Sequence, residues 1–328
     1  MKKILTLFLT ALMLAGFSSF LFISTVKAQN PSTVYDGTTS NLTAYETGRR
    51  VFKNPRGLSY YYTFYFDSDG YVKYAYSSDG TSWTSGNAAS ATTLSANHWD
   101  IDIVGDPTNN QLIVYLLHYG NARVRYRRGV IADSGYAISW GTESQLGGWS
   151  KNPLNIVVKV DNGGYLWFAW HKTNAAGNIA VSATSLPGDA PSFGRAAYET
   201  TTTTTYPTIV PTGSQTVDLI WQFGTTRLSG AGFTVSAGVP VKGTQYDLTK
   251  TLTNHHLSAV RSGTTTHVLY TDSNNLKHNT FVAGTGWGTE TTVKAATTVD
   301  SMSLALDATS SPNNLFAFYQ YGTLGDVY

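Results

Sequence analysis

A pattern of about 50 residues recurs six times along the chain, and this repeat constrains the fold more than any other feature. Each copy contains a short apolar strand that ends in an aromatic residue, then a polar turn and a second strand. The aromatic markers, spaced 50, 55, 51, 49 and 48 residues apart, are Tyr65, Tyr115, Trp170, Trp221, Tyr270 and Phe318. A constant period of this length is typical of one supersecondary unit used many times.

Each copy is predicted to hold four strands, because another strand precedes the marker and a Thr/Val-rich strand follows the turn. The preceding strands are expected in the segments RRVF, HWDIDIV, PLNIVVKV, TIVP, HHLSAV and SMSLAL. Four strands in a repeat of roughly 40–50 residues are typical of a propeller blade. We therefore predict an all-β fold, a six-bladed β-propeller of four-stranded antiparallel blades, as a single domain over residues 31–328. A β-sandwich is the alternative, although it gives no reason for a constant period.

The composition favours strands that are held together without covalent links. Charged residues make up 13% of the chain, against about 25% in average soluble domains, while Tyr numbers 21 and Trp 8. There is no Cys, so disulfides cannot close the fold. Residues 31–46 resemble residues 290–300, and we expect them to supply the outer strand of the last blade. That blade is expected to be incomplete at its C-terminal end, since residues 325–328 only begin its third strand.

The N-terminal residues 1–28 have the pattern of a signal peptide. Lys2 and Lys3 precede an apolar stretch at residues 4–26, and Val26-Lys27-Ala28 follows as a cleavage site. The alternative is an uncleaved membrane anchor, because 23 residues at about 1.5 Å each would span roughly 30 Å of hydrocarbon. Either way the protein is predicted to be secreted or extracytoplasmic, with membrane contact only through this segment.

The charge balance argues against a nucleic-acid partner. Without residues 1–28 the chain keeps 19 basic and 20 acidic residues. No excess of Lys and Arg is then available to neutralise phosphates. The expected partners are a carbohydrate or an envelope protein.

The segment SSDGTSW at residues 77–83 resembles the Asp-box turn (Ser-x-Asp-x-Gly-x-Thr-Trp, the BNR repeat) of the sialidase-type six-bladed propellers, with Gly80 one position early. The resemblance implies structural roles for Ser77, Asp79, Gly80 and Trp83. Asp79 would cap the hairpin between the third and fourth strands of a blade, and Trp83 would pack into the blade. In that family the turn lies away from the active site, so the resemblance bears on fold and not on catalysis.

The sialidases of this family grip the substrate carboxylate with three arginines. Here Arg49 and Arg50 are the only arginines that open an expected inner strand. The sequence therefore does not support a set of three arginines that bind a substrate carboxylate through paired hydrogen bonds, and it does not support true sialidase activity. We interpret the chain as a divergent, non-sialidase member of the family.

Polar residues at the starts of the innermost strands are the candidate ligand contacts, because those strands line the central channel of a propeller. The expected binding residues are Arg50, His98, Trp99, Asn152, Tyr206 and His256 (or its neighbour His255), and the expected catalytic residues are Asp100 and Asp300. His98, Asp100 and Asp102 share one strand face at period two, and Trp99 is expected to stack on a sugar ring.

Two functions of different classes fit these residues. In the first, the channel binds glycans, and Asp100 and Asp300 act as acid and base of a glycoside hydrolase, which requires two suitably spaced carboxyls. In the second, the protein is a noncatalytic interaction or structural propeller of the cell envelope. No cofactor is predicted. No metal is predicted either, since the adjacent His255 and His256 would point to opposite faces of a strand.

Overall fold

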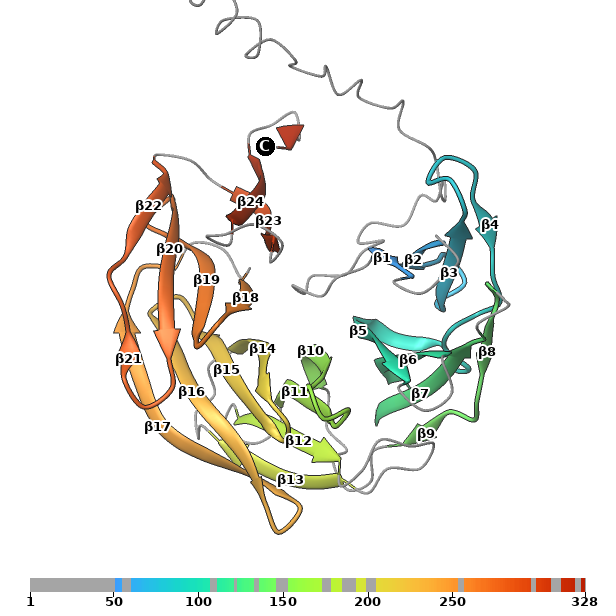
Figure 1. Ribbon diagram of the computed structural model, residues 1–328, viewed down its shortest axis with the longest axis horizontal. Helices are drawn as coiled ribbons and strands as arrows, with labels where there is room; N and C mark the ends of the chain where they lie inside the picture. Colours follow the sequence, from blue (N-terminus) through green and yellow to red (C-terminus); the bar gives the residue numbers. More distant parts are fainter. Residues whose placement is uncertain are drawn as a thin grey trace, which may run out of the picture. The chain divides into compact units, whose positions relative to one another are not determined.

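Every regular element in the described part of the chain is a β-strand. The computed structural model describes residues 51–54, 60–106, 111–120, 123–132, 136–145, 153–172, 178–184, 193–198, 205–252, 257–295, 299–307, 314–321 and 326–327, all within one compact unit, Val34–Tyr328. Among these residues there is no helix, so none there could cross a membrane. The strands form six antiparallel sheets, each built from one contiguous segment (Figure 1).

The first two sheets come from residues before 146. The first has the order β1 (Val51–Lys53), β2 (Tyr61–Phe66), β3 (Val72–Ser77) and β4 (Thr84–Ser85). The second has the order β5 (Leu94–Asp106), β6 (Gln111–Gly120), β7 (Arg123–Ile131) and β8 (Ile138–Trp140), with β9 (Ser144–Gln145) also paired to β7.

The third and fourth sheets each hold four strands. The third has the order β10 (Pro153–Val160), β11 (Leu166–Lys172), β12 (Asn178–Thr184) and β13 (Phe193–Tyr198). The fourth has the order β14 (Thr205–Gly213), β15 (Thr216–Phe223), β16 (Arg227–Ser236) and β17 (Val239–Thr249).

The last two sheets complete the series. The fifth has the order β18 (Ser258–Ser262), β19 (Thr265–Asp272), β20 (Asn275–Val282) and β21 (Gly286–Trp287), with β22 (Thr291–Lys294) paired to β20. The sixth has the order β23 (Val299–Asp307), β24 (Asn314–Tyr321) and β25 (Asp326–Val327), so it holds three strands among the described residues.

This arrangement confirms the predicted all-β fold with the layout of a propeller. All six expected inner segments contribute to the first strands of successive sheets, and all six aromatic markers lie on second strands. From β5 to β23, each first strand contacts the next one along the chain, and these strands are turned toward the centre in Figure 1. The 50-residue period in the sequence is therefore the repeat of one meandering sheet.

Apolar side chains fill the space between successive sheets, and sheets two to five each carry such side chains on both faces. In β6, Leu112, Val114 and Leu116 pack against the first sheet, whereas Ile113, Tyr115 and Leu117 pack against the third. Three further clusters join the third sheet to the fourth, the fourth to the fifth and the fifth to the sixth. The near-continuous apolar runs of these central strands follow from burial on both faces.

The sixth sheet has one packed face and one open face. Ala317 and Tyr319 of β24 pack toward the fifth sheet. Phe316 and Phe318, which alternate with them, are each 48% exposed. The segment expected to complete this sheet, residues 31–46, lies outside the described residues.

Tyr74 on β3 connects the first sheet to the second. Its hydroxyl accepts a hydrogen bond of 2.9 Å from the Ile138 backbone N–H on β8, and its ring lies directly against Gly86. A Cβ atom at residue 86 would lie 2.1 Å from the ring, well inside van der Waals contact. Gly86 is therefore required by the close approach of an aromatic ring.

We predict that Gly86→Ala lowers the free energy of unfolding by about 1–3 kcal/mol, because the added methyl group overpacks the contact with Tyr74. The neighbouring exposed variant Ser85→Ala should change it by less than about 0.5 kcal/mol. Urea denaturation of both variants measures the difference. Equal stabilities of the two variants would contradict this account of Gly86.

Candidate functional site

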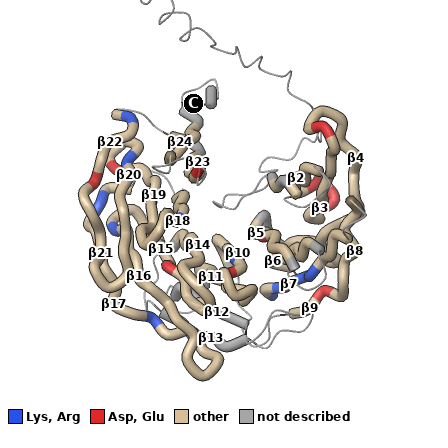
Figure 2. The backbone as a smooth tube through the Cα atoms, viewed as in Figure 1, with Lys and Arg blue, Asp and Glu red and all other residues tan. Residues whose placement is uncertain are grey.

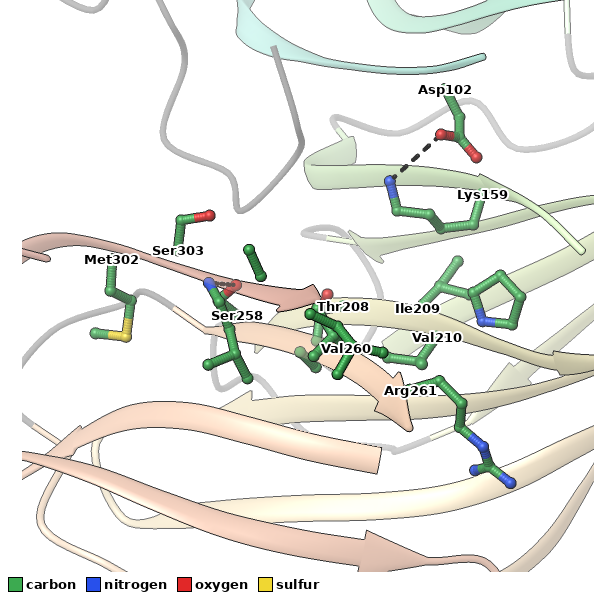
Figure 3. A pocket seen from close by; sticks show the side chains of 15 residues that line it. Asp102, Lys159, Thr208, Ile209, Val210, Ser258, Val260, Arg261, Met302 and Ser303 are labelled. Carbon is green, nitrogen blue, oxygen red and sulfur yellow. Dashed lines mark hydrogen bonds and ion pairs between the residues drawn. The ribbon is translucent and has the colours of Figure 1, made fainter. Parts of the chain in front are cut away.

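The first strands of five sheets enclose a cavity of about 500 Å³ near the centre of the sheets. Its walls come from β5, β10, β14, β18 and β23, and Figure 3 shows their side chains converging on it. The volume lies within the range of small-ligand sites. The expectation that inner strands line a common central space is therefore met by the described part of the fold.

The lining combines apolar side chains with hydroxyl groups. Thr208, Ser258 and Ser303 supply hydroxyls from three different strands, and the Ser258 Oγ also accepts a hydrogen bond of 2.8 Å from the Leu304 backbone N–H. The apolar lining residues include Ile209, Val210, Pro211, Val260 and Met302. A surface of this kind can contact both the carbon face and the hydroxyl groups of a small polar molecule.

One loose ion pair borders the cavity. The Lys159 Nζ on β10 lies 3.8 Å from the Asp102 Oδ1 on β5, and both side chains remain partly exposed (Figure 3). The other oxygen of Asp102 accepts a hydrogen bond of 2.9 Å from the Val160 backbone N–H. Asp102 is the single carboxylate among the described residues that line the cavity.

A tighter ion pair borders the cavity at Arg261 on β18. Its Nη1 donates to Asp218 Oδ2 at 2.8 Å and to Thr266 Oγ1 at 3.2 Å, and its Nε donates to the Gly263 carbonyl at 2.9 Å. Asp218 is 1% exposed and also accepts from the Thr266 hydroxyl at 2.6 Å. Burial raises the pKa of Asp218, while its hydrogen bond from Thr266 and the charge of Arg261 oppose the rise. Asp218 lies on β15, so the pair joins the fourth sheet to the fifth.

The predicted residues on β5 contact the backbone of the third sheet. His98 Nδ1 accepts a hydrogen bond from Asn155 N–H at 3.3 Å, and Asp100 Oδ2 accepts one from Val158 N–H at 2.8 Å. Asp102 makes the equivalent bond to Val160. Three side chains at period two thus satisfy N–H groups on the otherwise unpaired edge of β10. Because Asp100 is 0% exposed, the expectation of an open catalytic carboxylate there is corrected.

Trp99 points to the opposite face of β5. Its ring is fully buried among Tyr62, Phe64 and other residues of the cluster between the first and second sheets. The expectation that Trp99 offers a stacking face to a sugar is therefore corrected as well. Alternation along the strand explains both findings, because odd positions face one neighbouring sheet and even positions face the other.

The other predicted residues lie outside the cavity lining or outside the described residues. Tyr206 is the second residue of β14, half-buried and paired with Gln222, and the lining of that strand begins only at Thr208. Asp300 is the second residue of β23, where the lining begins at Met302. Arg50, Asn152 and His256 lie outside the described residues. Their predicted ligand contacts stay predictions.

The turn at residues 77–83 has the hydrogen bonds expected of an aspartate cap. Asp79 Oδ1 accepts from the Ser82 and Thr81 backbone N–H groups at 2.8 and 2.7 Å, and from the Ser77 hydroxyl at 2.9 Å. These bonds hold the pKa of Asp79 well below its usual value. Gly80 has a φ of 75°, which suits glycine. Trp83 is half-buried and not enclosed within the sheet.

Sequence reasoning missed the residues that make up the cavity wall. Lys159, Thr208, Ser258, Arg261 and Ser303 lie further along strands that were placed correctly. The first polar residue of each expected strand was chosen, whereas the cavity lies deeper. The segment SAVRS of β18 shows no clean alternation of polar and apolar residues, so no local pattern marks Ser258 and Arg261 as lining residues.

A buried charged cluster lies outside the cavity, in the second sheet. The carboxylate of Glu143 accepts hydrogen bonds of 2.8 Å from His118 Nε2, the Thr92 hydroxyl and the Ala91 N–H, and one of 3.4 Å from Arg125. Burial alone would raise the pKa of Glu143, but the hydrogen bond and charge of His118 outweigh it and hold the pKa at about 2. The cluster ties the segment between the first and second sheets to β6 and β7.

Comparison with solved structures shows the fold of this chain. A mutant of the Aleuria aurantia lectin in complex with alpha-methyl-L-fucoside matches with a TM-score of 0.55 and 14% identity, over 84% of this chain and 88% of the lectin chain. A mutant of the NanB sialidase from Streptococcus pneumoniae matches with a TM-score of 0.56 and 9% identity, over 92% of this chain and 69% of the sialidase chain. The Aleuria aurantia lectin described as a six-bladed β-propeller matches with a TM-score of 0.52 and 16% identity, over 76% and 78% of the two chains. No family model and no curated protein matches the sequence.

We predict that Asp100→Ala lowers the free energy of unfolding by about 1–3 kcal/mol, since the Val158 N–H is left buried without its acceptor. Asp100→Asn keeps a side-chain oxygen in the same place and should lose clearly less. Chemical denaturation of the two variants makes the comparison. If the alanine and asparagine variants lose equally little, the hydrogen bond is not what Asp100 contributes.

We predict that Glu143→Gln costs about 3 kcal/mol at neutral pH, because it breaks a buried charge network. The pKa of Glu143 is about 2 in the folded protein, below the ordinary value of 4.5. The stability that the ionised Glu143 carboxylate contributes to the folded protein is therefore fully present above pH 4.5 and is lost as the pH falls toward 2. The stability gap between wild type and variant, measured by denaturation from pH 7 to pH 3, should narrow on acidification. A constant gap over this range would contradict the assignment.

Proposed function

We propose that this chain is a noncatalytic carbohydrate-binding propeller whose central cavity holds part of a glycan. The observation that carries the proposal is the cavity of about 500 Å³, where hydroxyl groups from β14, β18 and β23 lie beside aliphatic side chains. Sugars present both hydroxyl groups and apolar C–H faces, so this lining fits them. The structural similarity to a lectin bound to a fucoside and to a sialidase adds support at the level of fold.

The described residues favour binding over hydrolysis. Glycoside hydrolysis generally needs two carboxyl groups about 5–5.5 Å or 6.5–9.5 Å apart. The described cavity lining supplies only Asp102, whose Oδ2 is engaged by the Val160 N–H. Asp100 is enclosed between sheets. Hydrolysis by Asp100 with Asp300 would require Asp100 to reach a ligand, and incubation of the protein with the glycans it binds tests for hydrolysis directly.

The finer architecture belongs to the same proposal. We propose six blades, with residues 31–46 completing the sixth sheet as its outer strand, and a divergent relationship to the sialidase-type Asp-box propellers. The hydrogen bonds of Asp79 support the relationship, and the six sheets support the blade number. Export directed by residues 1–28 and an envelope-protein partner stay predictions.

We predict that Ser303→Trp strongly weakens glycan binding, because this exposed side chain points into the cavity and an indole ring there would occupy space that the glycan needs (Figure 3). The control is Val241→Trp, which adds an indole at a position 44% exposed on the outer strand β17. Binding to a glycan array is measured for wild type and both variants. Retained binding by the Ser303 variant would exclude the cavity as the site, and absence of any binding by wild type would refute the proposed function.

A further inference from the structure

We infer that the central cavity selects uncharged polyhydroxylated ligands, and that Asp218, which lies behind the lining, sets this selectivity by neutralising Arg261. The inference deepens the proposed function and rests on the same cavity. Asp218 is not itself among the residues that line the cavity, although it is proposed to control which class of ligand binds there.

Arg261 is the group in the lining best suited to hold an anion. A guanidinium binds carboxylates and sulfates through paired donors, and Arg261, a lining residue, has a side chain that is 24% exposed. Its Nη1 is already directed to Asp218 and Thr266, and its Nε to the Gly263 carbonyl. An incoming anion would therefore meet a cation that is already paired.

Asp218 cannot easily leave this pairing. Its carboxylate is buried, accepts hydrogen bonds from both Arg261 and Thr266, and is fixed on the central strand β15. Separating a buried carboxylate from its cation costs far more free energy than an exposed ion pair contributes. An anion beside Arg261 would also be repelled by the Asp218 charge.

The second cation of the lining is balanced in the same way. Lys159 lies beside Asp102, and Asp102 is held in place by the Val160 N–H. Two cations and two carboxylates among the described residues thus cancel at the wall of the cavity. Among the described residues of the wall, the remaining side-chain polar groups are the hydroxyls of Thr208, Ser258 and Ser303, and they suit a neutral ligand.

The test separates this inference from glycan binding by using sulfate as the probe. Thermal midpoints of wild type, Asp218→Asn, Arg261→Gln and the double variant are measured while sulfate replaces chloride at constant ionic strength. Asp218→Asn keeps the shape of the side chain and frees the charge of Arg261. We expect its apparent affinity for sulfate to be at least about tenfold tighter than that of wild type. The gain should vanish in the double variant, and Thr266→Val, which changes no charge, should show none.

A sulfate response in wild type equal to that of Asp218→Asn would overturn the inference, as would a gain that survives loss of Arg261. If Asp218→Asn fails to fold, Asp102→Asn with and without Lys159→Met makes the same comparison at the other ion pair, and absence of a gain there overturns the inference. A parallel array of neutral oligosaccharides and their sialylated forms tests the natural ligand class. Wild type that prefers the sialylated forms contradicts the inference, whereas wild type that binds no glycan refutes only the proposed function and leaves the sulfate result to decide.

Discussion

The exposed backbone edge of each inner strand is the constraint on which the arrangement of the sheets depends. Among the described strands, β10 pairs with β11 alone, so N–H groups on its other edge need acceptors from elsewhere. The preceding sheet supplies them as the side chains of His98, Asp100 and Asp102. The Ser258 hydroxyl does the same for Leu304 between the fifth and sixth sheets. These bonds set the offset of one sheet against the next, which apolar packing alone leaves loosely defined.

The cavity is a consequence of the same geometry. The space between the converging first strands is not filled by apolar side chains alone, because the ion pairs that join neighbouring sheets also end there. Lys159 with Asp102 and Arg261 with Asp218 join neighbouring sheets and at the same time border the cavity. Elsewhere acidic and basic positions are scattered over several sheets, as Figure 2 shows. The same residues therefore join neighbouring sheets and determine the charge at the wall of the cavity.

The sequence predicted the fold well because the repeat reports directly on strand order. Tyr115, Trp170 and Trp221 recur at the same place in successive sheets, and all three rings are buried between sheets. The site was predicted less well, since a polar residue on an inner strand can face either a ligand or the backbone of the next sheet. Asp100 and Asp102 look alike in sequence, yet the first is enclosed and the second borders the cavity. Their positions along β5 relative to β10 distinguish them, and β10 itself has an irregularity in its pairing with β11, between Leu154 and Val157, that no local sequence pattern predicts.

Neighbouring sheets share their apolar clusters, and this sharing determines which sheet can separate from its neighbours at the lowest cost in free energy. Sheets two to five each belong to two of the described apolar clusters, so detaching one of them exposes both clusters to water at once. The first and sixth sheets each belong to one described cluster, but the cluster of the sixth sheet is much the smaller, and this sheet leaves Phe316 and Phe318 in solvent. Local opening therefore costs least at β23 and β24, and amide hydrogen exchange there should be the fastest of any first and second strands in the series.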